Sequence, residues 1–500
     1  MTTLEALKTY RDNIAKIKAL WHAMGVLHYD GATVAPVESA EGRGKTLAYL
    51  SGCDYEIETG KELAEAAQYL KAHKDELSAQ DAREIEVFLR DSEFTASIPQ
   101  AEYVAYTELL NKADAVWHKA KLDSDFASFA PYVKDIFETN VRFSKYYRPN
   151  QVAYDTQLDR YEKGLNMEKT DAFFNALKER IVPLLKKVMA KPQVDDSFLW
   201  GKTYPIEAQR KFSDYLMEVI TIDRDRCAIG ETEHPFTTNF NKKDVRITTH
   251  YHEDNFISSM YSVIHEGGHA LYELHSADEL EGTVLSGGVS MSIHESQSRF
   301  MENLIGRSRA FIELIFPKMQ ELFPEQLKGV TAEQMYRAVN KAEPSLIRTE
   351  ADELTYALHV LVRYEIEKGL FDGSIAVEDL PRVWNAKYKE YLGVDVPDDK
   401  QGVLQDSHWA GGNVGYFPSY ALGSAYGAQM LAKMRETVDV DAALRSGDLH
   451  PITNWLEEHI WRFGAMYDPM ELLERAVGEP FDPKYFTDYL EQKYTEIYGL

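Results

Sequence analysis

Apolar residues recur at intervals of three and four along most of the chain. The segment LEALKTYRDNIAKIKALW near the start and the segment YFTDYLEQKYTEIYGL at the end both show this spacing. Such spacing places apolar side chains along one face of an α-helix. The pattern therefore predicts a mostly α-helical protein.

One region breaks the helical pattern. In HPFTTNFNKKDVRITTHYH, residues 234–252, Val245 and Ile247 alternate with polar residues beyond an NKKD turn. Alternation on either side of a turn is typical of a β-hairpin. A further strand is predicted in GTVLSGGVSMS, residues 282–292, between two helical segments.

No feature of the sequence divides the chain clearly into domains. There is no Pro-, Gly- or Ser-rich linker, no low-complexity tract and no internal repeat. We expect one superdomain over residues 1–500. A boundary near residue 200 separates a first part with charged helices and few clustered histidines from a part, residues 201–500, that carries the candidate chemistry.

The composition narrows the classes of partner. The chain of 500 residues is 44% hydrophobic, which is enough for a large core, and its formal net charge is −26. An excess of Asp and Glu disfavours binding to the phosphate backbones of nucleic acids and to anionic membranes, because both are bound mainly by Lys and Arg. We therefore expect neither a nucleic-acid partner nor a membrane partner.

Cysteine usage and the start of the chain bear on the compartment. The two cysteines, Cys53 and Cys227, are far apart, which supports neither a disulfide framework nor a thiolate metal site. The first residues lack a basic end followed by an apolar run, and no stretch of about 18 apolar residues occurs. These features predict a cytoplasmic soluble protein.

The clearest chemical motif is HEGGH at residues 265–269, inside EDNFISSMYSVIHEGGHALYELH. The apolar stripe around it predicts a helix, with Asp254 as its N-cap. His265 and His269 are then about one turn apart and can converge on one metal ion, whereas Glu266 lies about 100° round the axis and can reach a water on that ion. This is the arrangement that zinc-dependent hydrolysis requires.

The plain alternative is that both histidines are ordinary surface or core residues, since HExxH also arises by chance. Gly267 and Gly268 favour the metal site. A glycine inside a helix lowers its stability by about 1 kcal/mol relative to Ala. Two glycines in the motif are explained if another group must approach the helix backbone closely.

Two histidine ligands require a third protein ligand and an open position for water. The segment IHESQSRFMENLIGR offers Glu295. His294 is a rival, but adjacent helical residues point in different directions, so only one of them serves. Glu302, seven residues after Glu295, lies on the same face and is a candidate to orient a ligand imidazole; the alternative is a solvated carboxylate.

Taken together, these segments resemble the carboxypeptidase Taq family of metallocarboxypeptidases. Five family motifs occur in order, and the resemblance spans the full length. They are DVRIT at 244–248, HEGGH at 265–269, HESQ at 294–297, IRTEAD at 347–352 and GVLQDSHW at 402–409.

The resemblance implies a helical fold with a deep central cleft, akin to the neurolysin and angiotensin-converting-enzyme group, in which residues 1 to about 200 form a cleft wall or lid. It also implies homodimers, one divalent metal per subunit and removal of residues from the free C-termini of peptides. Its metal ligands fall on His265, His269 and Glu295, and its catalytic glutamate on Glu266. Zinc is the favoured metal, with cobalt and manganese as alternatives.

Peptide hydrolysis also needs a hydrogen-bond donor for the oxyanion of the tetrahedral intermediate. Candidates for this donor lie in HWAGGNVGYFPSYALGSAYG, residues 408–427. The resemblance favours Tyr420, followed by Tyr416 and His408. The alternative for each is a packed core aromatic.

An exopeptidase must also bind the free C-terminal carboxylate, and the planar fork of Arg suits this task. Arg348 is the first candidate, at the start of a predicted helix and one turn before Asp352, which can hold its guanidinium. The alternative is a plain surface pair. Arg246 is the second candidate, with a salt bridge to Asp244 as its alternative.

His234 and Asp406 are polar residues near predicted turns and are candidates to line the cleft. Two other functions stay open. One is a metallo-endopeptidase or oligopeptidase, because HExxH plus Glu does not say where a peptide is cut. The other is a peptide-binding or scaffold protein with structural zinc, which an open coordination position argues against.

Overall fold

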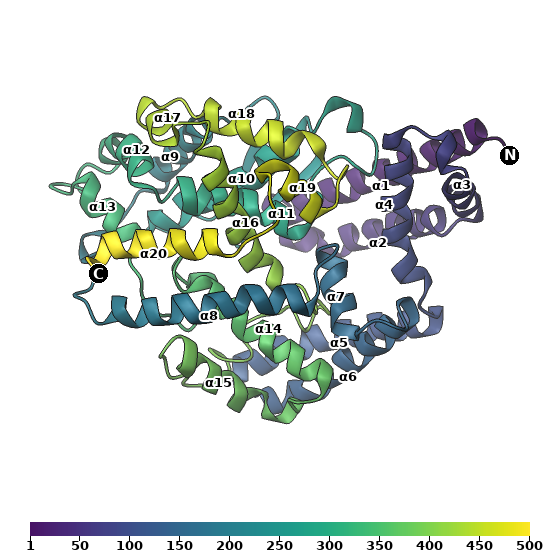
Figure 1. Ribbon diagram of the computed structural model, residues 1–500, viewed down its shortest axis with the longest axis horizontal. Helices are drawn as coiled ribbons and strands as arrows, with labels where there is room; N and C mark the ends of the chain where they lie inside the picture. Colours follow the sequence, from purple (N-terminus) through teal and green to yellow (C-terminus); the bar gives the residue numbers. More distant parts are fainter.

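The structure is a computed structural model that describes residues 1–500 (Figure 1). It contains twenty α-helices and one three-stranded sheet, so the predicted, mostly α-helical fold is confirmed. The helices before the sheet are α1 (Thr3–Thr33), α2 (Ala40–Glu58), α3 (Lys61–Ala72), α4 (Ala79–Ala96), α5 (Gln100–Asp123), α6 (Phe126–Tyr147), α7 (Ala153–Tyr161), α8 (Met167–Met189) and α9 (Ile206–Val219).

The remaining helices follow the sheet in the chain, and three of them, α10, α11 and α16, lie at the centre of the molecule (Figure 1). They are α10 (Phe256–Leu274), α11 (Met291–Arg299), α12 (Arg309–Leu322), α13 (Ala332–Val339), α14 (Tyr356–Asp372), α15 (Leu380–Tyr391), α16 (Pro418–Met434), α17 (Val440–Ser446), α18 (His450–His459), α19 (Pro469–Val477) and α20 (Lys484–Tyr498). A π-helical segment, η5 (Phe300–Ile305), continues directly from α11.

The sheet has the strand order β1-β3-β2. The strands β2 (Thr237–Asn241) and β3 (Asp244–Thr249) pair antiparallel, which confirms the predicted hairpin. The strand β1 (Cys227–Glu231) pairs parallel to β3 and was not predicted. Val245 and Ile247 of β3 belong to the same buried cluster as the apolar face of α10, so the sheet packs beside the helix that carries HEGGH.

The strand predicted at residues 282–292 is wrong. This segment consists of turns, and α11 begins at Met291. The backbone angle φ is +82° at Gly282 and +96° at Gly287. Such positive values suit glycine in turns and are incompatible with a regular strand. Ser290 then caps α11 by accepting a hydrogen bond from the backbone N–H of Ile293.

The core has one large part and two smaller parts, of which the smallest consists of Leu280, Leu285 and Ala465. A cluster of 105 buried residues extends from Ala113 to Tyr498. A separate cluster of ten buried residues lies between α1, α3 and α4. Buried apolar residues before about residue 100 thus pack in the cluster of ten, and most of those after it pack in the large cluster. The large cluster includes residues on both sides of residue 200, and the domain boundary expected near that residue stays a prediction.

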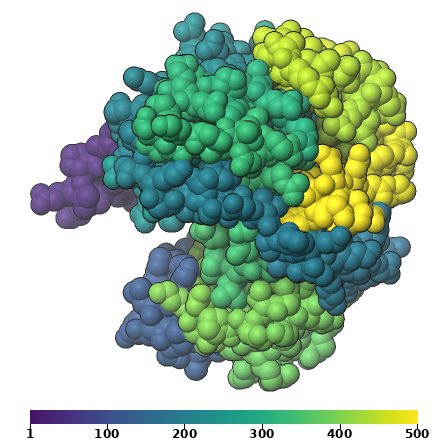
Figure 2. All heavy atoms as spheres, turned by 90° about the vertical axis from the view of Figure 1, so that its left-hand side faces the viewer, coloured from purple at the N-terminus to yellow at the C-terminus, as the bar shows by residue number.

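A deep cleft opens on one side of the molecule (Figure 2). One wall is blue and light green and includes α5, α6 and α15; the opposite wall is mainly teal and green and includes α12 and α13. The cleft that the resemblance implies is thus present.

Candidate metal centre and active site

Helix α10 begins one residue later than its sequence predicts. Its N-cap is Asn255, whose side chain accepts a hydrogen bond from the backbone N–H of Ser258, and not Asp254. The apolar stripe is buried as expected. It consists of Phe256, Met260, Ile264, Leu271 and Leu274.

The glycines of HEGGH allow a second helix to approach closely. A Cβ atom added to Gly268 would lie 2.5 Å from the backbone oxygen of Gln297 on α11. On the other side of α11, a Cβ on Gly423 of α16 would lie 2.7 Å from the Cγ of Glu295. Because neither position has room for a side chain, α11 is held between α10 and α16, and Glu295 is brought next to HEGGH.

Three predicted ligands converge at this contact. The Oε2 atom of Glu295 lies 3.9 Å from Nε2 of His265 and 3.5 Å from Nε2 of His269. All three donor atoms lie within 4.8 Å of one another. Ligands at about 2.1 Å from a tetrahedral ion lie roughly 3.4 Å apart. The donor set therefore fits one divalent metal ion.

Hydrogen bonds orient both imidazoles toward this point. Nδ1 of His265 lies 2.9 Å from Oε2 of Glu302, so this nitrogen donates and Nε2 keeps a free lone pair. Nδ1 of His269 lies 2.6 Å from Nδ1 of His294, whose Nε2 lies 2.7 Å from Glu273. We assign a donor chain from His269 through His294 to Glu273. His294, the rival third ligand, is thus engaged away from the metal position.

Arg299 completes the centre and was missed by the sequence reasoning. Its Nε donates to Oε1 of Glu295 at 2.8 Å, and its Nη1 donates to Oε2 of Glu302 at 3.2 Å. Burial opposes ionisation of both glutamates, but Arg299 and the histidines hold their pKa values well below the usual range. Because Oε1 of Glu295 accepts the hydrogen bond from Arg299, Oε2 is the oxygen that faces the two histidines and the metal position. The i,i+4 spacing in HESQSR was the available signal.

Glu266 lies beside the ligands and is held by the sheet. It is 7% exposed, and its Oε2 accepts a hydrogen bond from the hydroxyl of Thr237 on β2 at 2.6 Å. Thr237 was not singled out from the sequence, because nothing local shows that β2 reaches α10.

The predicted aromatic residues form one cluster. Nε2 of His408 lies 3.1 Å from the hydroxyl of Tyr420, and the rings of His408 and Tyr416 stack with centroids 5.6 Å apart. Burial raises the pKa of Tyr416 to about 12 and raises that of Tyr420 further. Tyr420 lies one turn before Gly423 on α16, where this helix touches Glu295, so the cluster borders the metal centre.

The predicted helical setting of Arg348 is wrong. Arg348 lies in a separate 3₁₀-helix of one turn, η6 (Arg348–Glu350), and not at the start of the α-helix, because α14 begins only at Tyr356. Its expected pair with Asp352 is also absent, because Asp352 accepts hydrogen bonds from the backbone of Leu354 and Thr355 instead. These hydrogen bonds place Asp352 in a turn that precedes α14, so the helix begins after Asp352 and not before Arg348.

Arg348 binds Asp406, 58 residues away. Its Nε and Nη2 donate to Oδ1 of Asp406 at 3.1 and 2.9 Å, and its guanidinium lies 4.8 Å from the ring centroid of Tyr420. Arg363, which the sequence reasoning missed, donates to Oδ2 of the same carboxylate at 2.6 Å. Two buried guanidinium groups thus share one carboxylate, which leaves a net positive charge beside Tyr420.

The other two predicted residues lie elsewhere. Arg246 donates to both carboxylate oxygens of Asp244 at 2.8 Å, and its guanidinium faces the rings of Tyr29 and Phe240. Arg246 thus forms the salt bridge that was its alternative, and its role in binding a substrate carboxylate stays a prediction. His234 is exposed, and its side chain does not join the metal centre.

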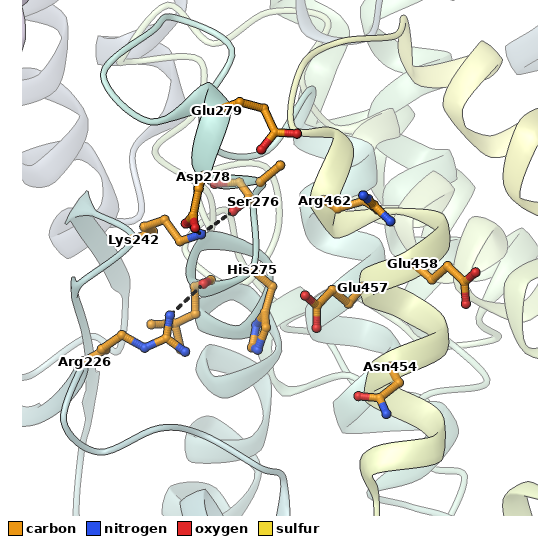
Figure 3. A pocket seen from close by; sticks show the side chains of 12 residues that line it. Arg226, Lys242, His275, Ser276, Asp278, Glu279, Asn454, Glu457, Glu458 and Arg462 are labelled. Atoms are coloured by element: carbon orange, nitrogen blue, oxygen red, sulfur yellow. Dashed lines mark hydrogen bonds and ion pairs between the residues drawn. The ribbon is translucent and has the colours of Figure 1, made fainter.

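A cavity of about 560 Å³ lies at the C-terminal end of α10, beyond the metal centre (Figure 3). Arg226 donates to the backbone oxygen of Leu274 at 3.2 Å, and Lys242 donates to that of Ser276 at 2.6 Å. Cations at helix C-termini satisfy the last carbonyls and favour the helix dipole. These cations therefore stabilise the end of α10.

His408 is expected to make stability depend on pH. Burial lowers its pKa from 6.5 to about 4, although Asp406 acts in the opposite direction. The folded state therefore keeps the imidazole neutral, whereas the unfolded state takes up a proton below pH 6.5, so this contribution to stability is lost as the pH falls from 6.5 to 4. His408→Gln should flatten the free energy of unfolding against pH over this window, as measured by urea denaturation. An unchanged slope would contradict the assignment.

These observations define a class of enzyme. Two histidines one turn apart, a glutamate ligand from a second helix and a further glutamate beside the open position are the arrangement of a helical metallopeptidase.

Comparisons with known proteins identify the family. The model of the carboxypeptidase Taq (M32) metallopeptidase family matches residues 9–494. The chain is 41% identical to carboxypeptidase 1 of Bacillus subtilis over 494 residues, which cover 99% of each protein. It is 36% identical to thermostable carboxypeptidase 1 of Thermus thermophilus, with 94% of each covered. The chain therefore belongs to the carboxypeptidase Taq (M32) family of metallopeptidases.

Solved structures agree with this assignment. The M32 carboxypeptidase from Deinococcus radiodurans R1 superposes with a TM-score of 0.96 at 34% identity, over 99% of this chain and 100% of the other. The chain is a metallocarboxypeptidase of this family, so a divalent metal is expected at the three ligands. No helix combines the length and the apolar character needed to cross a membrane.

Proposed function

We propose that the enzyme removes residues one at a time from the free C-terminus of peptides, with zinc held by His265, His269 and Glu295. The observation that carries this proposal is the pair of buried guanidinium groups on Asp406. It provides a net positive charge next to Tyr420, and hence next to the metal centre. A terminal carboxylate is the part of a peptide that such a charge selects.

The residues divide the chemistry between them. When bound, the metal supplies a Lewis acid that polarises the scissile carbonyl and acidifies water. Glu266 accepts the proton of the attacking water and delivers it to the leaving amine. Thr237 fixes one of its carboxylate oxygens through the hydrogen bond at 2.6 Å and leaves the other for the proton. Cobalt and manganese suit the same donor atoms and are the alternatives to zinc.

Tyr420 is our candidate donor for the oxyanion. Its raised pKa keeps the phenol protonated, so it can donate a hydrogen bond to the negative oxygen that develops in the transition state. Neutral His408 holds this hydroxyl from the other side. Tyr416 packs against both rings and supports their orientation.

Arg348 is our candidate for the terminal carboxylate. Its Nε and one N–H of Nη2 are used by Asp406, and Nη1 lies 3.2 Å from the hydroxyl of Tyr356. A guanidinium has five N–H donors, so two remain for a substrate.

Two broader features complete the proposal. We propose a homodimer, supported by the family resemblance. We also propose a cytoplasmic enzyme, supported by two free cysteines, of which Cys227 is buried.

One experiment tests the proposed function. Zinc-loaded enzyme is incubated with one unstructured peptide as the free acid and as the C-terminal amide, and the products are followed by mass spectrometry. We expect the free acid to yield a ladder that shortens by one residue at a time, while the amide resists. Internal cuts at similar rates in both forms would instead identify an endopeptidase.

A further inference from the structure

A buried glutamate outside the metal centre holds the segment that carries His408 and Tyr416. Glu367 lies on α14 and has no exposed surface. Its carboxylate accepts hydrogen bonds from Nε1 of Trp409 at 2.8 Å, from the backbone N–H of Gly415 at 2.9 Å and from the hydroxyl of Tyr154 at 2.9 Å. No described step of peptide hydrolysis uses this group.

Two of these donors bracket the active-site loop. Trp409 directly follows His408, and Gly415 directly precedes Tyr416. One carboxylate therefore fixes both ends of the loop 409–415. The backbone is tightly packed at the C-terminal end of this loop. Gly415 has φ +87°, and a Cβ atom at this position would lie 2.9 Å from the backbone of Gln157.

The third donor connects the loop to another part of the fold. Tyr154 lies on α7, and the same helix ends at Tyr161, whose ring packs edge-on against Tyr416 with centroids 5.1 Å apart. Glu367 thus joins α7, α14 and the loop at one point.

The chemistry of the position calls for a carboxylate. All three partners donate, and only an ionised carboxylate offers acceptors alone. Burial raises the pKa of Glu367 to about 7, while the three hydrogen bonds act in the opposite direction and favour the ionised form. A glutamine of the same shape would present two N–H donors, and at least one would face another donor in a buried setting, where an unmet polar group is costly. Arg363, one turn earlier on α14, binds Asp406 just before the loop.

We propose that Glu367 is a positioning residue, which acts through Trp409 and Gly415 to keep His408, Tyr416 and Tyr420 aligned with the metal centre. It does not touch substrate. The proposal rests on the proposed function, because it assigns the cluster a role in the transition state.

The test compares Glu367→Gln with the wild-type enzyme on a short peptide with a free C-terminus. We expect kcat to fall between about tenfold and a hundredfold, since small misplacements of catalytic groups have effects of this size. KM should change less than about twofold, because Arg348 is held separately by Asp406. Zinc content should stay the same.

Glu365→Gln is the matched control. Glu365 lies on the same helix and accepts hydrogen bonds from Lys178, Lys387 and Tyr391, none of which borders the loop. This variant should lose stability and keep the wild-type kcat. An equal loss of kcat in both variants would overturn the proposal, because the effect would then be general destabilisation.

A second readout does not depend on activity. Deuterium uptake by peptides covering residues 407–417 should rise in Glu367→Gln, whereas uptake in α10 and α11 should not. The proposal is overturned if uptake stays at the wild-type level, if kcat does not fall or if the variant loses zinc. Failure of the proposed function would appear differently, as internal cleavage by the wild-type enzyme.

Discussion

Glu266→Gln should lower kcat by at least about a thousandfold while the enzyme keeps its metal. Glu266 is the ionisable group that the fold places beside the three ligands without giving it a basic partner, and its Oε2 is already oriented by Thr237. Glutamine preserves the shape and the hydrogen bond but cannot accept and return a proton. Steady-state kinetics on a free-acid peptide and zinc analysis of the same sample measure the two effects.

The control for this experiment is Glu279→Gln. Glu279 is exposed at the cavity beyond the end of α10, so the same chemical change should leave kcat within about twofold, as is usual at the surface. The general-base role of Glu266 is withdrawn if folded, zinc-loaded Glu266→Gln retains substantial turnover.

Arg348→Ala should damage cleavage of free-acid peptides selectively. Loss of a buried charge that binds a substrate carboxylate costs about 2 kcal/mol or more, so we expect kcat/KM for the free acid to fall by at least about thirtyfold. Slow cleavage of the matching amide should hardly change, because the amide has no carboxylate to bind. The ratio of the two specificity constants is the quantity to measure.

The two substrates control for each other in this variant. Removal of Arg348 also leaves Asp406 with one guanidinium, and a general disturbance would reduce both rates together. An equal fall for acid and amide would count against a carboxylate clamp. An unchanged kcat/KM for the free acid would remove Arg348 from the binding site.

The sequence predicted those parts of the centre that depend on local geometry. A spacing of four residues on a helix places His265 and His269 on one face whatever surrounds them. The hairpin was also local, because alternation and a turn define it. The strand β1 is only five residues long, and it is held in the sheet by pairing with residues of β3 that lie 18 positions later in the chain, such as Ala228 with Arg246.

Partners that are distant in the chain could not be predicted in this way. Arg348 was expected to bind Asp352 because helical spacing was the available rule, but the fold supplies Asp406 instead. Thr237 reaches Glu266 from another element, and the loop that Glu367 contacts lies more than 40 residues further along the chain. The charge of Arg348 indicated that it needs a partner, but only packing determines which one it finds.

The π-helical segment η5 has a consequence for how this family can change over time. It adds a residue to the helical path between Glu302, which orients His265, and Arg307, which donates to Glu302 at 3.2 Å. A deletion here would rotate everything downstream by about 100° and break that contact. All six residues of this stretch are buried, and its length is fixed by that contact, so insertions and deletions among natural relatives should avoid residues 300–305.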